Sequence, residues 1–153
     1  MKTFPKRKTI RLREYDYSQA NYYHITICTV DNKRIFGMGN ELTKFGLIVE
    51  DQINEIQQHY KNISVEKYVI MPNHIHMIVV ISASDDGTKQ PMLGNIVGAF
   101  KAGVSREIHK IDSELNIWQS RFYDHIIKDD VDHENVWTYI DENPIKWEND
   151  EYY

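Results

Sequence analysis

Apolar residues along the chain follow two different periods. Steps of three and four residues predict amphipathic helices, and they occur over residues 42–60 and 91–110. Runs rich in β-branched and aromatic residues predict strands, and they occur over residues 22–30, 63–71 and 74–81. The segment 117–128 predicts one broken strand or two short strands. Residues 131 to about 142 predict a last helix, which ends near Pro144 because proline disfavours helical geometry in the preceding residue.

The order of these elements predicts an α+β fold. Strand, helix, strand, strand, helix, strand is the order of the ferredoxin-like split βαβ arrangement, in which an antiparallel sheet carries two helices on one face. Pro72 and Asn73 divide the two central apolar runs and predict a hairpin turn. The helix after the last strand is an additional part. We expect the second face of the sheet to be open, which calls for a ligand, a partner or polar residues there.

Length and composition indicate one globular domain over residues 1–153. The 153 residues are 41% hydrophobic and 27% charged, which argues against a disordered or fibrous protein. No apolar run reaches the roughly 20 residues of a membrane-spanning helix, and no secretory signal follows the basic N-terminus. The single cysteine excludes a disulfide framework and a cysteine-rich zinc site. We therefore expect an intracellular, cytoplasmic location.

Charge is distributed unevenly along the chain. Residues 1–13 hold six lysines and arginines and no acid, whereas the remaining 140 residues hold 12 basic and 23 acidic residues, a net charge of −11. A basic N-terminal arm (residues 1–14) on an acidic body can bind a polyanion locally, although a solvated, frayed terminus is an equal alternative.

Two histidines begin the strand 74–81. His74 and His76 are two residues apart, so their side chains share one face of the strand, while Ile75, Met77 and Val79 share the other. The apolar face should pack on the helices. Two imidazoles at this spacing can bind one divalent metal, which then needs at least one further ligand. A polar strand face without any chemistry is the alternative.

Tyr139 and Asn143 are four residues apart on the last predicted helix and therefore point the same way. The amide oxygen of Asn143 could complete a metal site while the phenol of Tyr139 reaches the same centre. A metal that polarises a phosphodiester would make attack by a phenol feasible. Simple helix packing by Tyr139 is the alternative, and Tyr123 and Tyr68 are further candidates for a nucleophile.

Several motifs together resemble those of the single-tyrosine HUH transposases. Met71-Pro-Asn-His74-Ile-His76 is similar to the His-hydrophobe-His motif of that family. Three further stretches resemble its REP-associated tyrosine transposase branch and occur in the same order: residues 95–101, 117–127 and 139–147. With residues 22–29, the resemblance covers about residues 20–147.

This resemblance implies a transposase that nicks single-stranded DNA and transfers the strand, usually beside a hairpin, through a 5′-phosphotyrosine intermediate. It implies Tyr139 as the nucleophile, and His74, His76 and Asn143 as ligands of Mg²⁺ or Mn²⁺. Glu142 stands where members of the branch often have a second asparagine, so its carboxylate is an alternative ligand. Family members are commonly homodimers, in which the tyrosine serves its own or the partner's histidines.

DNA contact would rest on the basic residues of the arm and on those of the second helix. The candidates are Arg7, Lys8, Arg11, Arg13, Lys101 and Arg106. His125, on a strand expected near that of His74, is interpreted as supporting the site or the structure rather than as a ligand. Two other function classes remain alternatives: a non-catalytic DNA-hairpin-binding regulator on the same scaffold, and a zinc hydrolase of a small substrate.

Overall fold

The computed structural model describes residues 21–38, 40–82 and 91–144. Its strands are β1 (Asn21–Cys28), β2 (Gly37–Met38), β3 (Glu41–Leu42), β4 (Ile63–Met71), β5 (His74–Ile81) and β6 (Tyr123–Ile127). Its helices are α1 (Lys44–His59), α2 (Leu93–His109), α3 (Asp130–Glu142) and the short 3₁₀ turn η1 (Val30–Asn32). Within these ranges no helix combines the length and the apolar character needed to cross a membrane.

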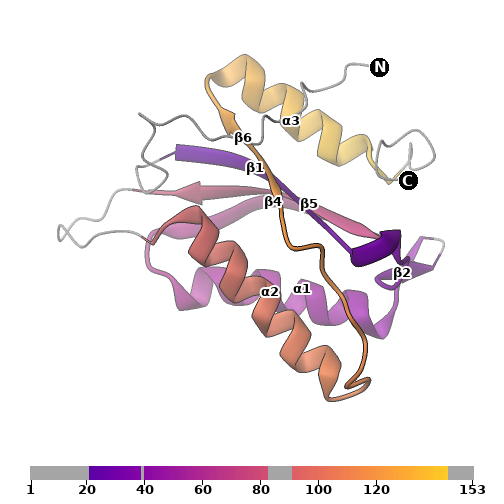
Figure 1. The fold of residues 1–153 in the computed structure, drawn as a ribbon. Coiled ribbons are helices and arrows are strands. Elements are labelled where there is room, and N and C mark those ends of the chain that lie inside the picture. The colour runs from indigo at the N-terminus through magenta and orange to yellow at the C-terminus, as the bar shows by residue number, and fades with distance from the viewer. Residues whose placement is uncertain (1–20, 39, 83–90, 145–153) are drawn as a thin grey trace.

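The four long strands form one antiparallel sheet in the order β4-β5-β1-β6. This is the order of the ferredoxin-like fold, and it confirms the predicted α+β class (Figure 1). The register pairs Thr26 of β1 with His76 of β5 on one side and with Tyr123 of β6 on the other. Directly opposed residues point to the same face of a sheet, so this register determines which side chains share the face of the histidines.

Helices α1 and α2 cover one face of the sheet, as expected. Alternate residues of β5, among them Ile75, Met77 and Val79, are fully buried against this pair of helices. Burial of one such side chain contributes about 1.5–3 kcal/mol to folding. The main hydrophobic core therefore lies between the sheet and the two helices, and it fixes the direction in which the intervening histidines point.

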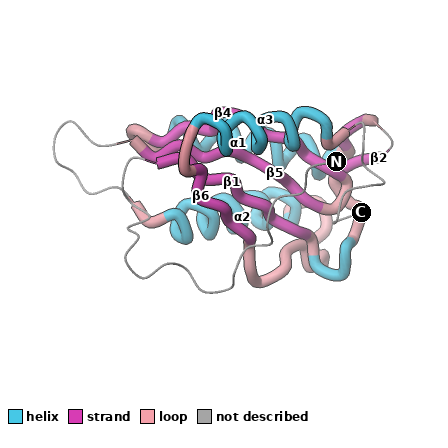
Figure 2. Tube along the Cα trace, turned by 90° about the horizontal axis from the view of Figure 1, so that it is seen from above, coloured by secondary structure: helices cyan, strands magenta, loops and turns pink. Residues whose placement is uncertain are grey.

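The opposite face of the sheet is not open, which corrects the expectation from the sequence. Helix α3 lies across it (Figure 1), and Figure 2 shows α3 from above, over β4 at one side of the sheet. A second, smaller core forms there, where Val136 and Ile140 of α3 meet Ile78 and Val80 of β5. Ile78 and Val80 lie on the same face of β5 as the histidines. The apolar side of α3 covers them and is therefore the partner that this face requires.

Two local features differ in detail from the sequence prediction. The segment 117–128, expected as one broken strand or two short strands, contains one five-residue strand, β6, and before it an isolated bridge between Thr29 and Trp118. The short pair β2–β3 was not predicted, because two residues per strand carry no periodicity that could reveal it.

Candidate active site

His74 and His76 lie at the start of β5, on the face that α3 covers. Both side chains are buried, with 0% and 1% of their surface exposed. Their ring centroids are 4.8 Å apart, and the ring planes are nearly perpendicular at 82°. The alternation along β5 thus brings both imidazoles to one place, as predicted, but in a buried rather than a solvent-exposed position.

Each of the two imidazoles contacts the protein through its Nδ1 atom. His74 Nδ1 donates to the side-chain oxygen of Asn73, at 2.6 Å. His76 Nδ1 lies 2.9 Å from the hydroxyl oxygen of Thr26 and 3.2 Å from Nε2 of His24. A histidine that binds a metal uses one ring nitrogen for the metal and is oriented by a contact at the other. The contacts at Nδ1 make Nε2 the nitrogen of each ring that is suited to a metal.

Tyr139 lies against these histidines within the same chain. Its ring centroid is 5.1 Å from that of His76, with an angle of 78° between the planes, and 6.0 Å from that of His24. The side chain is partly buried, on the side of α3 that packs on the sheet. The structure therefore brings the predicted tyrosine and the predicted histidine pair together without a second copy of the chain.

Asn143 follows Tyr139 by one helical turn and is 4% exposed. Among the residues that the structure describes, its side-chain oxygen Oδ1 is buried and has no hydrogen-bond partner. A buried carbonyl oxygen without a partner is costly, which marks Oδ1 as a candidate ligand atom. In the same ranges no three His, Cys, Asp or Glu side chains are grouped to hold a metal ion. Glu142 is therefore not grouped with the two histidines in such a site.

The other candidate tyrosines differ in position. Tyr68 is directly opposite Met77, on the face packed against α1 and α2, and its hydroxyl donates to Glu50 Oε2 at 2.8 Å. Burial, followed by the hydrogen bond to and the charge of Glu50, raises the pKa of Tyr68 to about 12. Tyr123 is 41% exposed and shares the face of Thr26. Tyr68 is thus on the wrong side of the sheet to act with the histidines, whereas Tyr123 is not.

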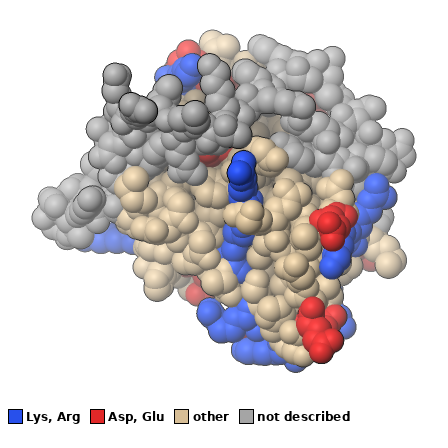
Figure 3. All heavy atoms as spheres, in the orientation of Figure 1, with Lys and Arg blue, Asp and Glu red and all other residues tan. Residues whose placement is uncertain are grey.

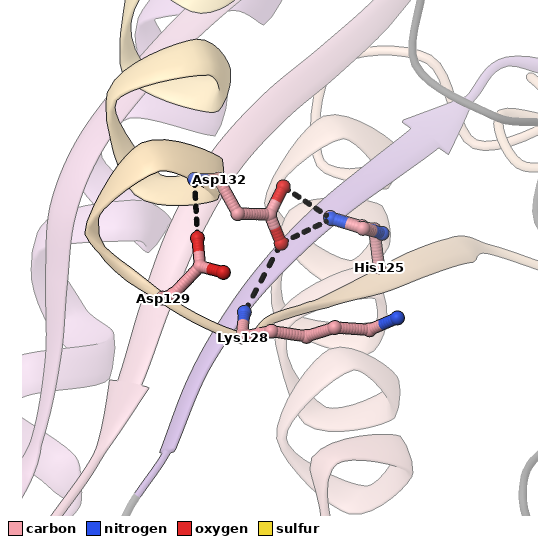
Figure 4. Close-up of polar contacts among 4 residues, drawn as sticks. All are labelled: His125, Lys128, Asp129 and Asp132. Atoms are coloured by element: carbon pink, nitrogen blue, oxygen red, sulfur yellow. Dashed lines mark hydrogen bonds and ion pairs between the residues drawn. The ribbon is translucent and has the colours of Figure 1, made fainter.

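The N-terminus of α3 is attached to β6 by a small group of polar contacts (Figure 4). His125 Nε2 donates to the carboxylate of Asp132, 2.9 Å from each oxygen. The same carboxylate accepts from the backbone N–H of Lys128 at 3.0 Å, and Asp129 caps the helix by accepting from the N–H of Asp132 at 2.8 Å. Strand β1 separates β6 from β5, so the expected closeness of His125 to His74 is wrong. His125 instead holds the helix that carries Tyr139.

The two basic candidates that the structure describes, Lys101 and Arg106, are not brought to this site. Arg7, Lys8, Arg11 and Arg13 lie outside the described residues. Lys101 and Arg106 are on α2, which packs on the opposite face of the sheet. The ammonium group of Lys101 donates to the backbone carbonyl of Gln119 at 2.6 Å, and burial lowers its pKa. Figure 3, which views the side of α2, shows a row of Lys and Arg atoms down the middle of this face.

Two residues of the site, His24 and Thr26, were not found from the sequence. Both are on β1, at 7% and 4% exposure. Their signal is the alternation of Tyr22, His24, Thr26 and Cys28 on one face of the first predicted strand. In a ferredoxin-like sheet the first strand neighbours the third, so this polar face could have been matched to that of His74 and His76.

Comparison with known proteins identifies the family. The family model described as Transposase IS200 like matches residues 17–143 of the chain. The chain belongs to the IS200-like transposase family. The two histidines, Tyr139 and Asn143 all fall within the matched range, as does the whole described sheet.

Two relatives of this transposase family member come from Haemophilus influenzae. One carries the name "Uncharacterized protein"; it is 32% identical over 96% of this chain and 93% of its own length. The other is named "Putative REP-associated tyrosine transposase" and is 27% identical over 86% of this chain and 74% of its own length. A solved structure of a REP-associated tyrosine transposase bound to a REP hairpin has the same fold. It has a TM-score of 0.69 and 20% identity over 91% of this chain and 74% of that one.

Proposed function

We propose that this transposase nicks single-stranded DNA and transfers the strand, with Tyr139 as the nucleophile. The observation that carries the proposal is the placement of the Tyr139 ring 5.1 Å from that of His76, in a chain whose family is that of transposases. Phenols are weak nucleophiles near pH 7, because their ordinary pKa is about 10. The site must therefore supply a group that makes the phosphodiester more reactive.

The donor atoms of the site fit a divalent metal ion, for which we propose Mg²⁺ or Mn²⁺. The ligands would be the Nε2 atoms of His74 and His76 and the buried, unpartnered Oδ1 of Asn143. Imidazole nitrogen suits divalent ions of the first transition series, whereas carbonyl and substrate oxygens suit both Mn²⁺ and Mg²⁺, and three protein ligands leave positions open for oxygens of the substrate. A bound ion would polarise the phosphodiester and stabilise the charge that develops on its oxygens.

The proximity of Tyr139 to the histidines supports the following proposed reaction. Its phenol oxygen attacks the phosphorus, a bond from oxygen to phosphorus forms, and the bond from phosphorus to the 3′ oxygen of the upstream nucleotide breaks. The phenol proton is released to solvent, and the departing 3′ oxygen takes up a proton to become a hydroxyl. The downstream strand remains attached to Tyr139 through its 5′ phosphate. Attack of a 3′ hydroxyl on this phosphotyrosine reverses the step and joins strands.

We propose single-stranded DNA that contains a hairpin as the substrate. A relative is named as a REP-associated transposase, and a neighbour with the same fold was solved with a REP hairpin bound. The body of the chain is acidic, so the basic arm supplies the main attraction for phosphates. We place the DNA contacts at Arg7, Lys8, Arg11 and Arg13, with Lys101 and Arg106 of α2 as a separate basic surface.

The experiment that tests the nucleophile uses single-stranded hairpin oligonucleotides labelled at the 3′ end, incubated with the protein and Mn²⁺. A label that stays with the protein on a denaturing gel reports the 5′-phosphotyrosine adduct. We expect the adduct in the unmodified protein and none in Tyr139→Phe. The matched variants Tyr123→Phe and Tyr68→Phe remove the same hydroxyl group elsewhere and should retain it.

Two outcomes would contradict the proposal in different ways. An adduct that persists in Tyr139→Phe and is lost in Tyr123→Phe would move the nucleophile to β6. Salt-sensitive binding of the hairpin with no adduct at any concentration of Mg²⁺ or Mn²⁺ would instead indicate a DNA-binding regulator that uses the same scaffold.

A further inference from the structure

Strand β1 contributes two side chains to the surroundings of His76. Thr26 is directly opposite His76 in the register, and its hydroxyl oxygen lies 2.9 Å from His76 Nδ1. His24 is two residues along the same face of β1, and its Nε2 lies 3.2 Å from the same Nδ1. His76 Nδ1 thus has two polar neighbours, both on a strand that carries none of the residues with a proposed role in the reaction.

The hydrogen bond of His74 with Asn73 shows how a contact at Nδ1 determines which ring nitrogen carries the proton. The side-chain oxygen of Asn73 can only accept a hydrogen bond, so His74 Nδ1 carries the proton that it donates. A neutral imidazole holds one proton, and a proton on Nδ1 leaves a lone pair on Nε2. In this tautomer Nε2 can bind a metal ion. Asn73 therefore sets the tautomer of the first histidine of the pair.

We infer that Thr26 and His24 do the same for His76: they are positioning residues that keep its proton on Nδ1 and so make Nε2 the ligand atom. In this arrangement Nδ1 donates its one proton to the hydroxyl oxygen of Thr26 at 2.9 Å, and Nε2 of His24, at 3.2 Å, is the second and more distant acceptor. Their burial, with 4% and 7% exposed, keeps water from replacing either of them. The inference rests on the proposed function in one respect, since it assigns to His76 Nε2 the metal that the function requires.

His24 also links the histidine pair to the nucleophile. Its ring is 5.3 Å from that of His76 and 6.0 Å from that of Tyr139, so it lies beside both. A shift of the His24 ring would change the contact at Nδ1 and the packing of Tyr139 together. Thr26 contacts the same Nδ1 atom through a hydroxyl group, so a change at Thr26 tests this contact without replacing a ring that packs beside Tyr139.

The first test reads the tautomer directly, without a metal. Two-dimensional ¹⁵N–¹H spectra of the imidazoles in the unmodified protein distinguish a proton on Nδ1 from one on Nε2. The His76 signals are assigned through their coupling to the assigned backbone. At a pH where His76 is neutral, we expect the proton on Nδ1. A proton on Nε2 would overturn the inference, whatever the protein does with DNA.

The second test measures the Kd for Mn²⁺ by isothermal titration calorimetry. Thr26→Val keeps the shape of the side chain and removes the oxygen, and we expect its Kd to rise by about 10–100-fold, the usual effect of losing a partner of a metal ligand. Thr26→Ser restores a hydroxyl and should recover most of the affinity. Thr138→Val makes the same change at an exposed position of α3 and should leave the Kd unchanged.

These outcomes separate the inference from the proposed function. A Kd of Thr26→Val equal to that of the unmodified protein would overturn the role of Thr26. If the unmodified protein binds no Mn²⁺, the metal site of the proposed function fails, while the tautomer measurement still decides the contact at Nδ1. Thermal unfolding of each variant shows whether it is folded, and a Thr26→Val protein that does not fold leaves the spectra of the unmodified protein as the deciding result.

Discussion

At the scale of single residues, the site places polar groups where water cannot reach them. Removal of His74, His76 and Asn143 from water is unfavourable unless each finds a partner. For the two histidines, the contacts at Nδ1 offset part of the free-energy cost of removal from water. For Asn143 Oδ1 no such contact exists among the described residues, and a ligand would provide it.

Asn143 and Glu142 are adjacent alternatives for the third ligand, and a matched pair of variants distinguishes them. We predict that Asn143→Leu, which keeps the volume and removes the amide oxygen, raises the Kd for Mn²⁺ by about 10-fold or more, since even the loss of a ligand's partner has that effect. Glu142→Gln should change it little. Titration calorimetry on both proteins measures this. The reverse result would make Glu142 the third ligand.

Tyr68 provides a prediction about pH. Its pKa is raised to about 12 in the folded protein, mainly by burial and also by Glu50. The unfolded chain loses this proton near pH 10 and the folded chain only near pH 12, so the folded state binds more protons between these values. The contribution of Tyr68 to stability is thus present below pH 10 and is lost as the pH rises toward 12.

The corresponding measurement compares urea unfolding of the unmodified protein and of Tyr68→Phe at pH 9, 10, 11 and 12. We expect the unmodified protein to lose about 1 kcal/mol more than the variant over this range, after allowance for partial solvent screening. Tyr60→Phe removes a hydroxyl elsewhere on the surface of the same core and is the control. Equal losses in all three proteins would show that Tyr68 does not titrate in this way.

The sequence identifies some residues of the site better than others for a physical reason. The shared face of His74 and His76 follows from strand alternation, and that of Tyr139 and Asn143 from the helical repeat, so both are local properties. The contacts of His24 and Thr26 with His76 join residues 52 and 50 positions apart. They depend on the register between β1 and β5, which local patterns do not specify.

At the scale of elements, β4 and β5 begin and end at the predicted residues, because Pro72 and Asn73 mark the turn between them. Helix α3 also lies where its pattern predicted, but this pattern did not reveal that α3 would cover the sheet face that was expected to be open. Its apolar face is narrow, with Val136 and Ile140 as its only fully buried residues in the described range. Such a short apolar pattern predicts that a helix forms, but it does not indicate which surface of the protein the helix covers.

Two glycines in helices α1 and α2 give opposite predictions for the same substitution. A Cβ atom at Gly46, in the first turn of α1, would lie 2.1 Å from the backbone oxygen of Phe36. A Cβ atom at Gly98, in α2, would have no atom within 4 Å outside its own helix. Gly46 thus permits the close approach of α1 to the preceding loop, whereas Gly98 serves no such purpose.

We therefore predict that Gly46→Ala lowers the free energy of unfolding by about 1–3 kcal/mol or more, because the backbone has to move to relieve the overlap. Gly98→Ala should raise it by about 0.5–1 kcal/mol, since alanine is the better helix former. Urea unfolding followed by circular dichroism measures both. A Gly46→Ala protein as stable as the unmodified one would show that α1 does not approach Phe36 so closely.

At the scale of the whole molecule, the sheet separates two functions of the fold. Helices α1 and α2 on one face build the main core, and α3 lies on the other face (Figure 1), where it brings Tyr139 to the histidines. Lys101 and Arg106 are on α2, on the face of the sheet opposite to Tyr139. These residues would contact DNA only if the DNA extends from Tyr139 around the edge of the sheet. Polar links from β6 and β4 hold α3 in place: His125 to Asp132, Glu66 to His133, and Lys67 to Asp141 at 2.9 Å.

The position of α3 makes a prediction about assembly. In this structure Tyr139 lies beside the histidines of its own chain, so each copy of a homodimer would hold a complete site. We predict that a His74→Ala, His76→Ala chain co-expressed with a Tyr139→Phe chain forms no DNA adduct, because neither chain has both parts of the site. A dimer that joined a tyrosine of one chain to histidines of the other would regain one working site in such a mixed pair.

The measurement purifies mixed pairs through two different affinity tags and incubates them with 3′-labelled hairpin oligonucleotides and Mn²⁺. Light scattering shows whether the species has twice the 18.2 kDa of one chain. A pair of unmodified and Tyr139→Phe chains is the control, and it should give adduct only on the unmodified chain. Adduct on the chain without histidines would require the tyrosine helix to reach the partner, and α3 would then have to leave Ile78 and Val80. Such a movement would expose the smaller core to water and would break the links His125–Asp132, Glu66–His133 and Lys67–Asp141, so these contacts would have to be weak enough to open during the reaction.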